Sequence, residues 1–392
     1  MPRYVSSRLK FIYLGALILA LHYSFTIYIN SNFLSEYFSE RTISYLYTSG
    51  AILTLIAFII STSLIKRFGN FRVIIAVIFA EIISLLGLFA TRDPALIKFF
   101  FIIHQALPPL LLMGLDVFLE GTLRTQASIG RIRSMYLTSM NLAFVISPLI
   151  VGKIISVSSY QVIYLISALL CALFLFITVE SFRTIRTREL KEVNFLESVR
   201  TFLKHKDLCR IFIINFLLQS FYAVMVIYTP LYLHNVIGFD WQSIGAIFTV
   251  MLIPFVIFEA PLGRMFDAMH TEKDTLIVGF IIMALATVLM FSVTSTSIAT
   301  WMLLLFFSRM GASFVEVASD YAFFLRISDQ DVGLISVNKM TGPLAYIVIP
   351  LTIQLFITTL PINYLFLFTG ITLSIGTIFS YKLRSIKAKR IL

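Results

Sequence analysis

Twelve apolar segments fill this chain almost from end to end, and each is long enough to cross a lipid bilayer. An apolar run of about 18 or more residues is typical of a transmembrane helix, because that length spans the hydrocarbon core. The segments cover residues 11–33, 42–65, 72–91, 96–123, 132–156, 159–180, 209–236, 241–263, 274–294, 298–325, 332–357 and 361–381. They leave little sequence for a soluble domain, so the sequence predicts an all-α membrane protein with twelve transmembrane helices.

The distribution of charge indicates how the chain is oriented in the membrane. If the N-terminus lies in the cytoplasm, the cytoplasmic segments hold 25 of the 31 Lys and Arg residues, and the outer segments hold 4. This asymmetry follows the positive-inside rule. We therefore expect an inner or plasma membrane protein with both termini in the cytoplasm. The same rule explains the net charge of +11, which therefore does not indicate a nucleic-acid partner.

Sequence signatures of metal, cofactor and nucleotide chemistry are missing. Cys171 and Cys209 are the only cysteines, too few for a disulfide framework or a cysteine metal site. The sequence contains no phosphate-binding Gly-rich loop, no zinc-ligand spacing and no nucleophile elbow. We expect no cofactor, no metal and no enzymatic activity.

Landmark residues recur at an offset of about half the chain. The offsets are 203, 202 and 204 positions for three matched pairs, which are Gly130 and Gly333, Pro148 and Pro350, and Asp116 and Asp320. A nearly constant offset indicates a duplicated six-helix unit. The sequence therefore predicts two pseudo-symmetric six-helix bundles, 1–180 and 209–392, joined by a cytoplasmic linker at 181–208 with a short amphipathic helix. Two such halves form a transporter architecture, with the substrate site at their interface.

The loop between the second and third segments carries a family resemblance. Residues 66–72, KRFGNFR, are similar to the Gly-rich basic signature loop of the major facilitator superfamily, and residues 261–267 keep its Gly-x-x-x-Asp part. Residues 228–238 resemble the seventh helix of the family, and the resemblance covers essentially the whole chain. Two departures are Lys66, where the family usually has Asp, and a fifth segment that keeps only a remnant of the antiporter motif. The drug–proton antiporter subgroup is therefore not indicated.

Ionisable residues inside the apolar segments are the first candidates for function, because such side chains are costly in a membrane. Arg309, Glu316 and Asp320 are spaced by 7 and 4 residues. At about 100° per residue they fall within about 20° of one line along a helix. We interpret Asp116, Glu316, Asp320 and Lys339 as a network for ion coupling. The alternative is a buried ion network that only fixes helix packing.

Two further ionisable residues lie within the third and fourth segments. Glu81 is isolated in the sequence. We expect it to be a protonated carboxyl group bonded to a neighbouring helix, with proton transfer as the alternative. His104 is followed by Pro108 and Pro109, which indicate a kink in the fourth segment.

The resemblance implies that the first, fourth, seventh and tenth helices line a central cavity. Polar residues in the first and seventh segments recur at the spacing of one helix face. With the arginine of the tenth segment they make up the expected substrate cavity: His22, Thr26, Asn30, Asn215, Gln219, Tyr222 and Arg309.

The resemblance also implies that each signature loop docks at the start of a helix in the opposite half and closes the cytoplasmic side. Asp267 fits this role, because an anion suits the positive N-terminal end of a helix. On the other side, Lys66 stands where the acid would be, and acidic residues lie at the start of the eleventh segment. The predicted gate residues are Lys66, Arg67, Gly69, Arg131, Arg133, Glu259, Gly263, Asp267, Asp329 and Asp331.

These patterns together predict a secondary active transporter of a small solute, which works as a monomer by alternating access and is coupled to protons. Arg309 would suit an anionic or zwitterionic solute, whereas the acidic residues would suit a cation. One alternative is a signalling or assembly scaffold with the same fold, which would lose the polar residues of the cavity. Another is a polytopic membrane enzyme acting on lipid-linked groups, which would need an acid–base pair at one membrane face.

Overall fold

The computed structural model of the chain describes residues 3–27, 29–122, 129–183, 185, 195–327, 332–357 and 361–384. In the first half of the chain the elements are α1 (Arg3–Ile27), α2 (Asn30–Ser35), α3 (Glu40–Phe68), α4 (Asn70–Ala90), α5 (Pro94–Thr122), α6 (Ile129–Val157), α7 (Tyr160–Ile177) and the π-helix η2 (Thr178–Phe182). In the second half they are α8 (Phe195–Lys204), α9 (Lys206–Asn235), α10 (Trp241–Met269), α11 (Glu272–Ser292), α12 (Ile298–Phe324), α13 (Val332–Lys339), α14 (Thr341–Ile357) and α15 (Tyr364–Lys382). Within the described ranges no strand is present.

The described helices account for twelve membrane crossings. Eleven helical stretches are long and apolar enough to span a bilayer, and α3 adds a shorter apolar stretch, Tyr45–Ser61. One of the eleven combines α13 and α14, which are interrupted at Met340. Pro343 explains the interruption, because it has no N–H to donate to the carbonyl of Lys339 four residues earlier. The prediction of an all-α membrane protein with twelve transmembrane helices is confirmed.

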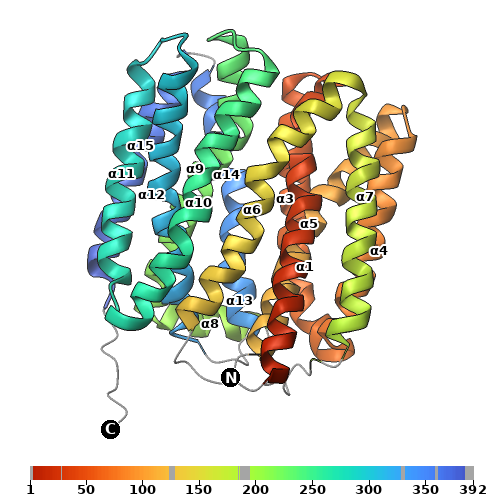
Figure 1. The fold of residues 1–392 in the computed structure, drawn as a ribbon, viewed down its shortest axis with the longest axis vertical. Helices are drawn as coiled ribbons and strands as arrows, with labels where there is room; N and C mark the ends of the chain where they lie inside the picture. Colours follow the sequence, from red (N-terminus) through yellow and green to blue (C-terminus); the bar gives the residue numbers. More distant parts are fainter. Residues whose placement is uncertain are drawn as a thin grey trace.

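The helices form two bundles that lie side by side (Figure 1). We call α1–α7 the N-half and α9–α15 the C-half. The N-half lies on the right of Figure 1 and the C-half on the left, with α6 and α10 running between them. The start of α1 and the end of α15 lie at the same end of the molecule, which we call the terminal face. α6 packs along α10, and α3 packs along α14, so these two pairs join the halves.

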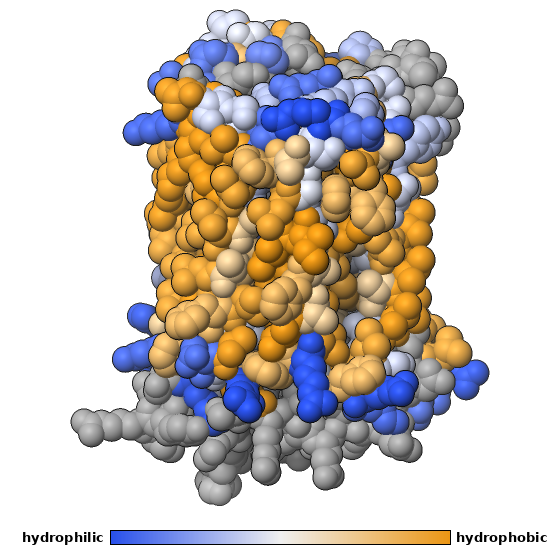
Figure 2. Space-filling view, turned by 90° about the vertical axis from the view of Figure 1, so that its right-hand side faces the viewer, coloured by the Kyte–Doolittle hydropathy of each residue, from blue (hydrophilic) through white to orange (hydrophobic). Residues whose placement is uncertain are grey.

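The outer surface is apolar at the middle of the molecule, as a lipid bilayer requires. Figure 2 shows a broad apolar band across the face in view, with hydrophilic residues above and below it. In lipid every backbone N–H and C=O must be bonded within the protein, and helices achieve this without a partner. The band therefore marks the part of the protein that lies within the membrane.

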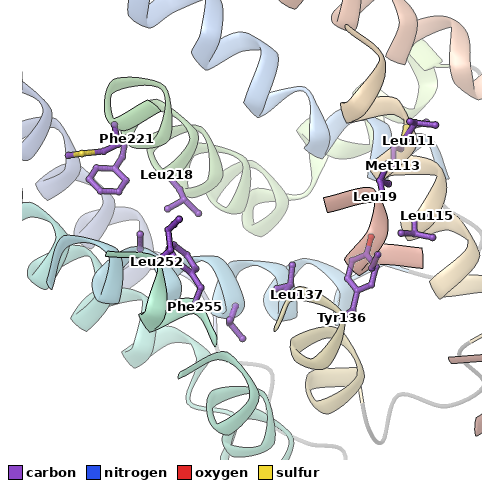
Figure 3. Packing of buried hydrophobic residues seen from close by; sticks show 14 of the residues in the cluster. Leu19, Leu111, Met113, Leu115, Tyr136, Leu137, Leu218, Phe221, Leu252 and Phe255 are labelled. Atoms are coloured by element: carbon purple, nitrogen blue, oxygen red, sulfur yellow. The ribbon is translucent and has the colours of Figure 1, made fainter. Parts of the chain in front are cut away.

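Apolar side chains of both halves make one continuous core cluster. Figure 3 shows Leu137 of α6 between Tyr136 and Leu115 on the N-half side and Leu218 and Phe255 on the C-half side. This contact lets α6 belong to one bundle and pack against the other.

The linker helix α8 packs under the terminal face and contacts α9, α13 and α3. Its Phe202 is buried against the rings of Phe212 and Phe323. On the outer side, Leu196 and Leu203 are exposed. The apolar face of α8 is therefore divided between the protein and the surroundings.

Candidate functional site

A cavity of about 260 Å³ lies between the two halves. It is lined by residues of α1, α3, α5 and α6 from the N-half and of α9, α12, α13 and α14 from the C-half. Its polar and charged lining residues include Gln105, Asp116, Asn215, Gln219, Glu316, Asp320, Asn338 and Lys339. A polar cavity bounded by both halves can hold a solute and can also change shape when the halves move.

Two ion pairs cross from one half to the other on the terminal side of this cavity. Arg133 of α6 donates from Nε to Oδ2 of Asp320 on α12 at 2.8 Å, and from Nη2 to Oδ1 at 2.9 Å. Nζ of Lys339, at the end of α13, lies 2.7 Å from Oδ2 of Asp116 on α5. The pseudo-symmetry of the fold relates the two pairs, since α5 corresponds to α12 and α6 to α13.

Arg133 is also bonded within its own half. Its Nη2 lies 3.1 Å from Oδ1 of Asp116, and its Nη1 lies 3.1 Å from Oε1 of Glu120. The guanidinium carbon is 3.4 Å from the centroid of the Phe324 ring, and Arg133 is only 2% exposed. In this network two cations face three carboxylates, and each desolvated charge needs its partners to remain ionised. We call Asp116, Glu120, Arg133, Asp320 and Lys339 the ion network.

The terminal ends of α6 and α10 are in direct backbone contact. The backbone N–H groups of Gly130 and Arg131 each donate to the carboxylate of Asp267 at 2.9 Å. These amides are at the start of α6, where a helix has unpaired donors and a positive dipole end. Gly263 has no room for a side chain, because a Cβ there would collide with the carbonyl of Gly130 and with Ser134. A larger residue at this point would keep the two helices apart.

Glu259 of α10 joins the halves nearer to the middle of the membrane. Its Oε1 accepts a hydrogen bond from Nδ2 of Asn141 on α6 at 2.7 Å, and Thr138 donates to its Oε2 at 3.4 Å. Glu259 is fully buried. The contact between α6 and α10 is therefore polar as well as close.

Glu316 faces the cavity and accepts a hydrogen bond from the hydroxyl of Tyr222 at 2.6 Å. In the described part of the chain it takes part in no ion pair, unlike Asp320 one turn later. Arg309 is 3% exposed and stacks on the rings of Phe221 and Tyr222, with its guanidinium carbon 5.1 and 5.2 Å from their centroids. Arg309 is not among the residues that line the cavity.

The structure places several predicted cavity residues elsewhere. His22, Thr26 and Asn30 are buried inside the N-half and do not line the cavity. Tyr222 does not line the cavity, but it bonds to Glu316, which does. By contrast, Asn215 and Gln219 line the cavity, and Asn215 donates to Oδ1 of Asn338 across α9 and α13 at 3.1 Å. Residue spacing indicates which side chains share a helix face, but not which neighbour that face meets.

The predicted ionic contacts also differ in their partners. Of the predicted coupling network, Asp320 is paired with Arg133 and Lys339 with Asp116, whereas Glu316 bonds to Tyr222. Arg131 meets Asp267 through its backbone, and the side chain of Arg133 turns to the ion network. The predicted site residues did not include Glu120, which bonds to Arg133, or Asn141, which bonds to Glu259. Both lie at helical spacing from residues that were selected.

The other signature loop, residues 66–72, joins α3 to α4. Gly69 ends α3 with φ of 81°, a conformation that favours glycine. Arg67 lies over the ring of Phe68, and Lys66 is exposed. Asp329 and Asp331, the partners expected for this loop, lie outside the described residues.

A family model agrees with this architecture along the whole chain. The model described as Major Facilitator Superfamily matches residues 12–251 and 241–391. The chain belongs to the major facilitator superfamily. Its fold is similar to the crystal structure of the human organic anion transporter MFSD10 (TETRAN), with a TM-score of 0.80. That match covers 97% of this chain and 100% of MFSD10 at 11% sequence identity, so it shows a shared fold. No curated protein sequence matched the chain.

Membership of this superfamily identifies the chain as an integral membrane protein and a membrane transporter.

Proposed function

We propose that this protein is a secondary active transporter that moves a small solute by alternating access and couples the movement to protons. The observation that carries the proposal is the position of the ion network. Asp116, Asp320 and Lys339 of this network line the cavity, and two of its ion pairs join opposite halves. Opening the terminal side requires both pairs to separate, so the same residues bound the solute site and hold one access route closed.

Glu316 is the carboxyl group best placed to exchange a proton during transport. It faces the cavity, and its partner Tyr222 offers a neutral hydrogen bond in place of a cation. A carboxylate held this way is costly in a membrane unless it is protonated or meets a positive ligand. Asp116 and Asp320 face the same cavity but are neutralised by Lys339 and Arg133.

The same geometry favours a solute with a positively charged group, such as an amine, over a purely anionic one. Glu316 would accept this group, while Asn215 and Gln219 supply amide hydrogen bonds. The solute and a proton would then compete for one carboxyl group, which is the simplest physical basis for coupling. The organic anion in the name of MFSD10 belongs to that protein and is not transferred to this one.

Uptake into proteoliposomes tests the proposal. Purified protein should accumulate at least one member of a panel of amines, amino acids, sugars, peptides and organic anions when a pH gradient is imposed. Amine-bearing solutes should be favoured. Uptake that is unchanged when the gradient is collapsed would contradict proton coupling. If no panel member enters the proteoliposomes faster than it enters protein-free vesicles, the protein does not transport a solute of these classes. An organic anion as the preferred solute would contradict the role given to Glu316.

A further inference from the structure

A second group of ionisable residues is buried within the N-half, away from the ion network. Nδ1 of His104 on α5 lies 2.6 Å from Oε1 of Glu81 on α4, and Nε2 of His22 on α1 lies 3.1 Å from the same oxygen. All three side chains are at most 1% exposed. None of them lines the cavity between the halves. We call these residues the N-half cluster.

The contacts of His22 with Ser167 favour one tautomer of its imidazole ring. The hydroxyl of Ser167 on α7 donates to the backbone carbonyl of His22 at 2.8 Å, and its oxygen lies 2.7 Å from Nδ1 of His22. A hydroxyl has one hydrogen, so both contacts are hydrogen bonds at once only when Nδ1 donates to the hydroxyl oxygen. In that tautomer a neutral His22 has a bare lone pair on Nε2, which lies 3.1 Å from Oε1 of Glu81.

This arrangement requires one more proton than neutral histidines and an ionised Glu81 would provide. If Glu81 were ionised and His22 neutral, a lone pair and a carboxylate would face each other across 3.1 Å. With His104 neutral as well, the charge would be buried without compensation, and Oε2 of Glu81 has no hydrogen-bond partner among the described residues. Either one of the two histidines is an imidazolium ion or Glu81 is protonated, and in each case the cluster holds one more proton.

No other charged group facing the cluster can replace that proton. α7 presents Tyr164, whose ring meets that of His104, and Cys171, and both are neutral in their ordinary protonation states. α1 and α5 present only His22 and His104, and the two histidines are the only cations within ion-pair distance of Glu81 in the described part of the chain. The described residues also contain no group suited to holding a metal ion.

The cluster lies directly behind the cavity wall. Tyr23 and Gln105, the chain neighbours of His22 and His104, both line the cavity. Pro108 and Pro109 lie inside α5 and cannot donate to the carbonyls of His104 and Gln105, four residues before them. α5 therefore lacks two backbone hydrogen bonds where His104 faces the cluster and Gln105 faces the cavity. A change of charge in the cluster can alter the wall at this point.

We propose that His22, Glu81 and His104 form a proton-binding site that is separate from Glu316. The proton of this site stays bound while α1, α4 and α5 keep the packing seen in this structure. Release requires His22 and Glu81 to separate, because they repel each other once the proton is gone. Proton occupancy is therefore linked to the packing of these helices, and through Tyr23 and Gln105 to the shape of the cavity. Proton binding by this cluster does not depend on the proposed transport mechanism. The effect of the cluster on transport does rest on that mechanism.

Proton binding is measured on the full-length protein in nanodiscs without solute. A pH jump from acidic to alkaline conditions, followed with an indicator dye, should release roughly one proton per molecule more from wild type than from Glu81→Gln. In protein labelled with ¹⁵N-histidine, the signals of His22 and His104 should change together over the same pH range, and both should stop responding in Glu81→Gln. Signals are assigned with His22→Gln and His104→Gln. Ser84→Ala is the matched control, because Ser84 is buried on the same helix but bonds only to the carbonyl of Ala80.

Equal proton release from wild type and Glu81→Gln, or independent titration of the two histidines, would overturn the proton site. If Glu81→Gln does not fold, as judged by thermal unfolding, the two histidine variants carry the same comparison. In transport assays, Glu81→Gln should flatten the pH dependence of solute exchange, a mode that needs no gradient. An unchanged pH profile would overturn the link to the cavity, whereas loss of gradient-driven uptake in Glu316→Gln tests the coupling proposal separately.

Discussion

Arg133 of the N-half and Asp320 of the C-half are joined by two hydrogen bonds of 2.8 and 2.9 Å, from Nε and Nη2 of one guanidinium group to both oxygens of one carboxylate. A two-bond contact of this kind fixes orientation as well as distance. It lies on the terminal side of the cavity, beside the pair formed by Lys339 and Asp116. Relative movement of the halves at this side must break it.

Replacing Arg133 tests whether the ion network holds this side closed. In Arg133→Gln the carboxylates of Asp116, Glu120 and Asp320 lose their shared cation, and breaking such a buried pair costs about 3–5 kcal/mol. We expect a lower unfolding temperature and greater labelling of a cysteine at the cavity-lining Met140 by a reagent applied at the terminal face, in a Cys171→Ala, Cys209→Ser background. Arg72→Gln, at an exposed position at the start of α4, is the control. Labelling equal to that of the control would show that the network does not close the cavity.

Glu316→Gln tests the coupling role of the cavity carboxyl group. The amide keeps the shape and can still bond to Tyr222, but it cannot bind or release a proton. Gradient-driven uptake should fall on the order of tenfold or more, while exchange of solute at equal pH should persist. Tyr222→Phe, which leaves the carboxyl group in place, should retain the pH dependence. Full gradient-driven uptake by Glu316→Gln would exclude it as the coupling residue.

Two glycine variants test the contact between α6 and α10. A methyl group at Gly263 would collide with Gly130 and Ser134, whereas a methyl group at Gly152 meets open space. Overpacking of this kind costs about 1–3 kcal/mol, and here separation of the helices relieves it. Gly263→Ala should therefore favour opening at the terminal face, measured by the same cysteine labelling. Gly152→Ala should behave as wild type, and the same behaviour in Gly263→Ala would mean that closure does not need this contact.

Reporter fusions test the orientation. The excess of Lys and Arg at the terminal face predicts that this face is cytoplasmic. Fusions after Leu392 and within 181–208 should report the cytoplasm, and a fusion after Asn235 should report the outside. An external C-terminus would reverse the orientation on which the gate is based.

Membrane insertion, the number of helices and the repeat could be predicted from the sequence, because they depend on length, apolar content and spacing along the chain. The contact of Asp267 with the start of α6 was expected from the family resemblance. The structure adds that the acid bonds to two backbone amides, while the neighbouring Arg133 side chain serves another network.

The partners of the charged residues were decided only by the tertiary structure. Periodicity places His22, Thr26 and Asn30 on one face of the first apolar segment, but packing turns that face into the N-half. There His22 meets Glu81, which is 59 positions away in the chain. No sequence pattern links these two positions. Likewise Arg133 and Asp320 are 187 residues apart. The apolar pattern determines that a helix crosses the membrane, whereas the rotation of that helix about its axis depends on side-chain fit among several helices at once, and this fit determines which buried charges can meet.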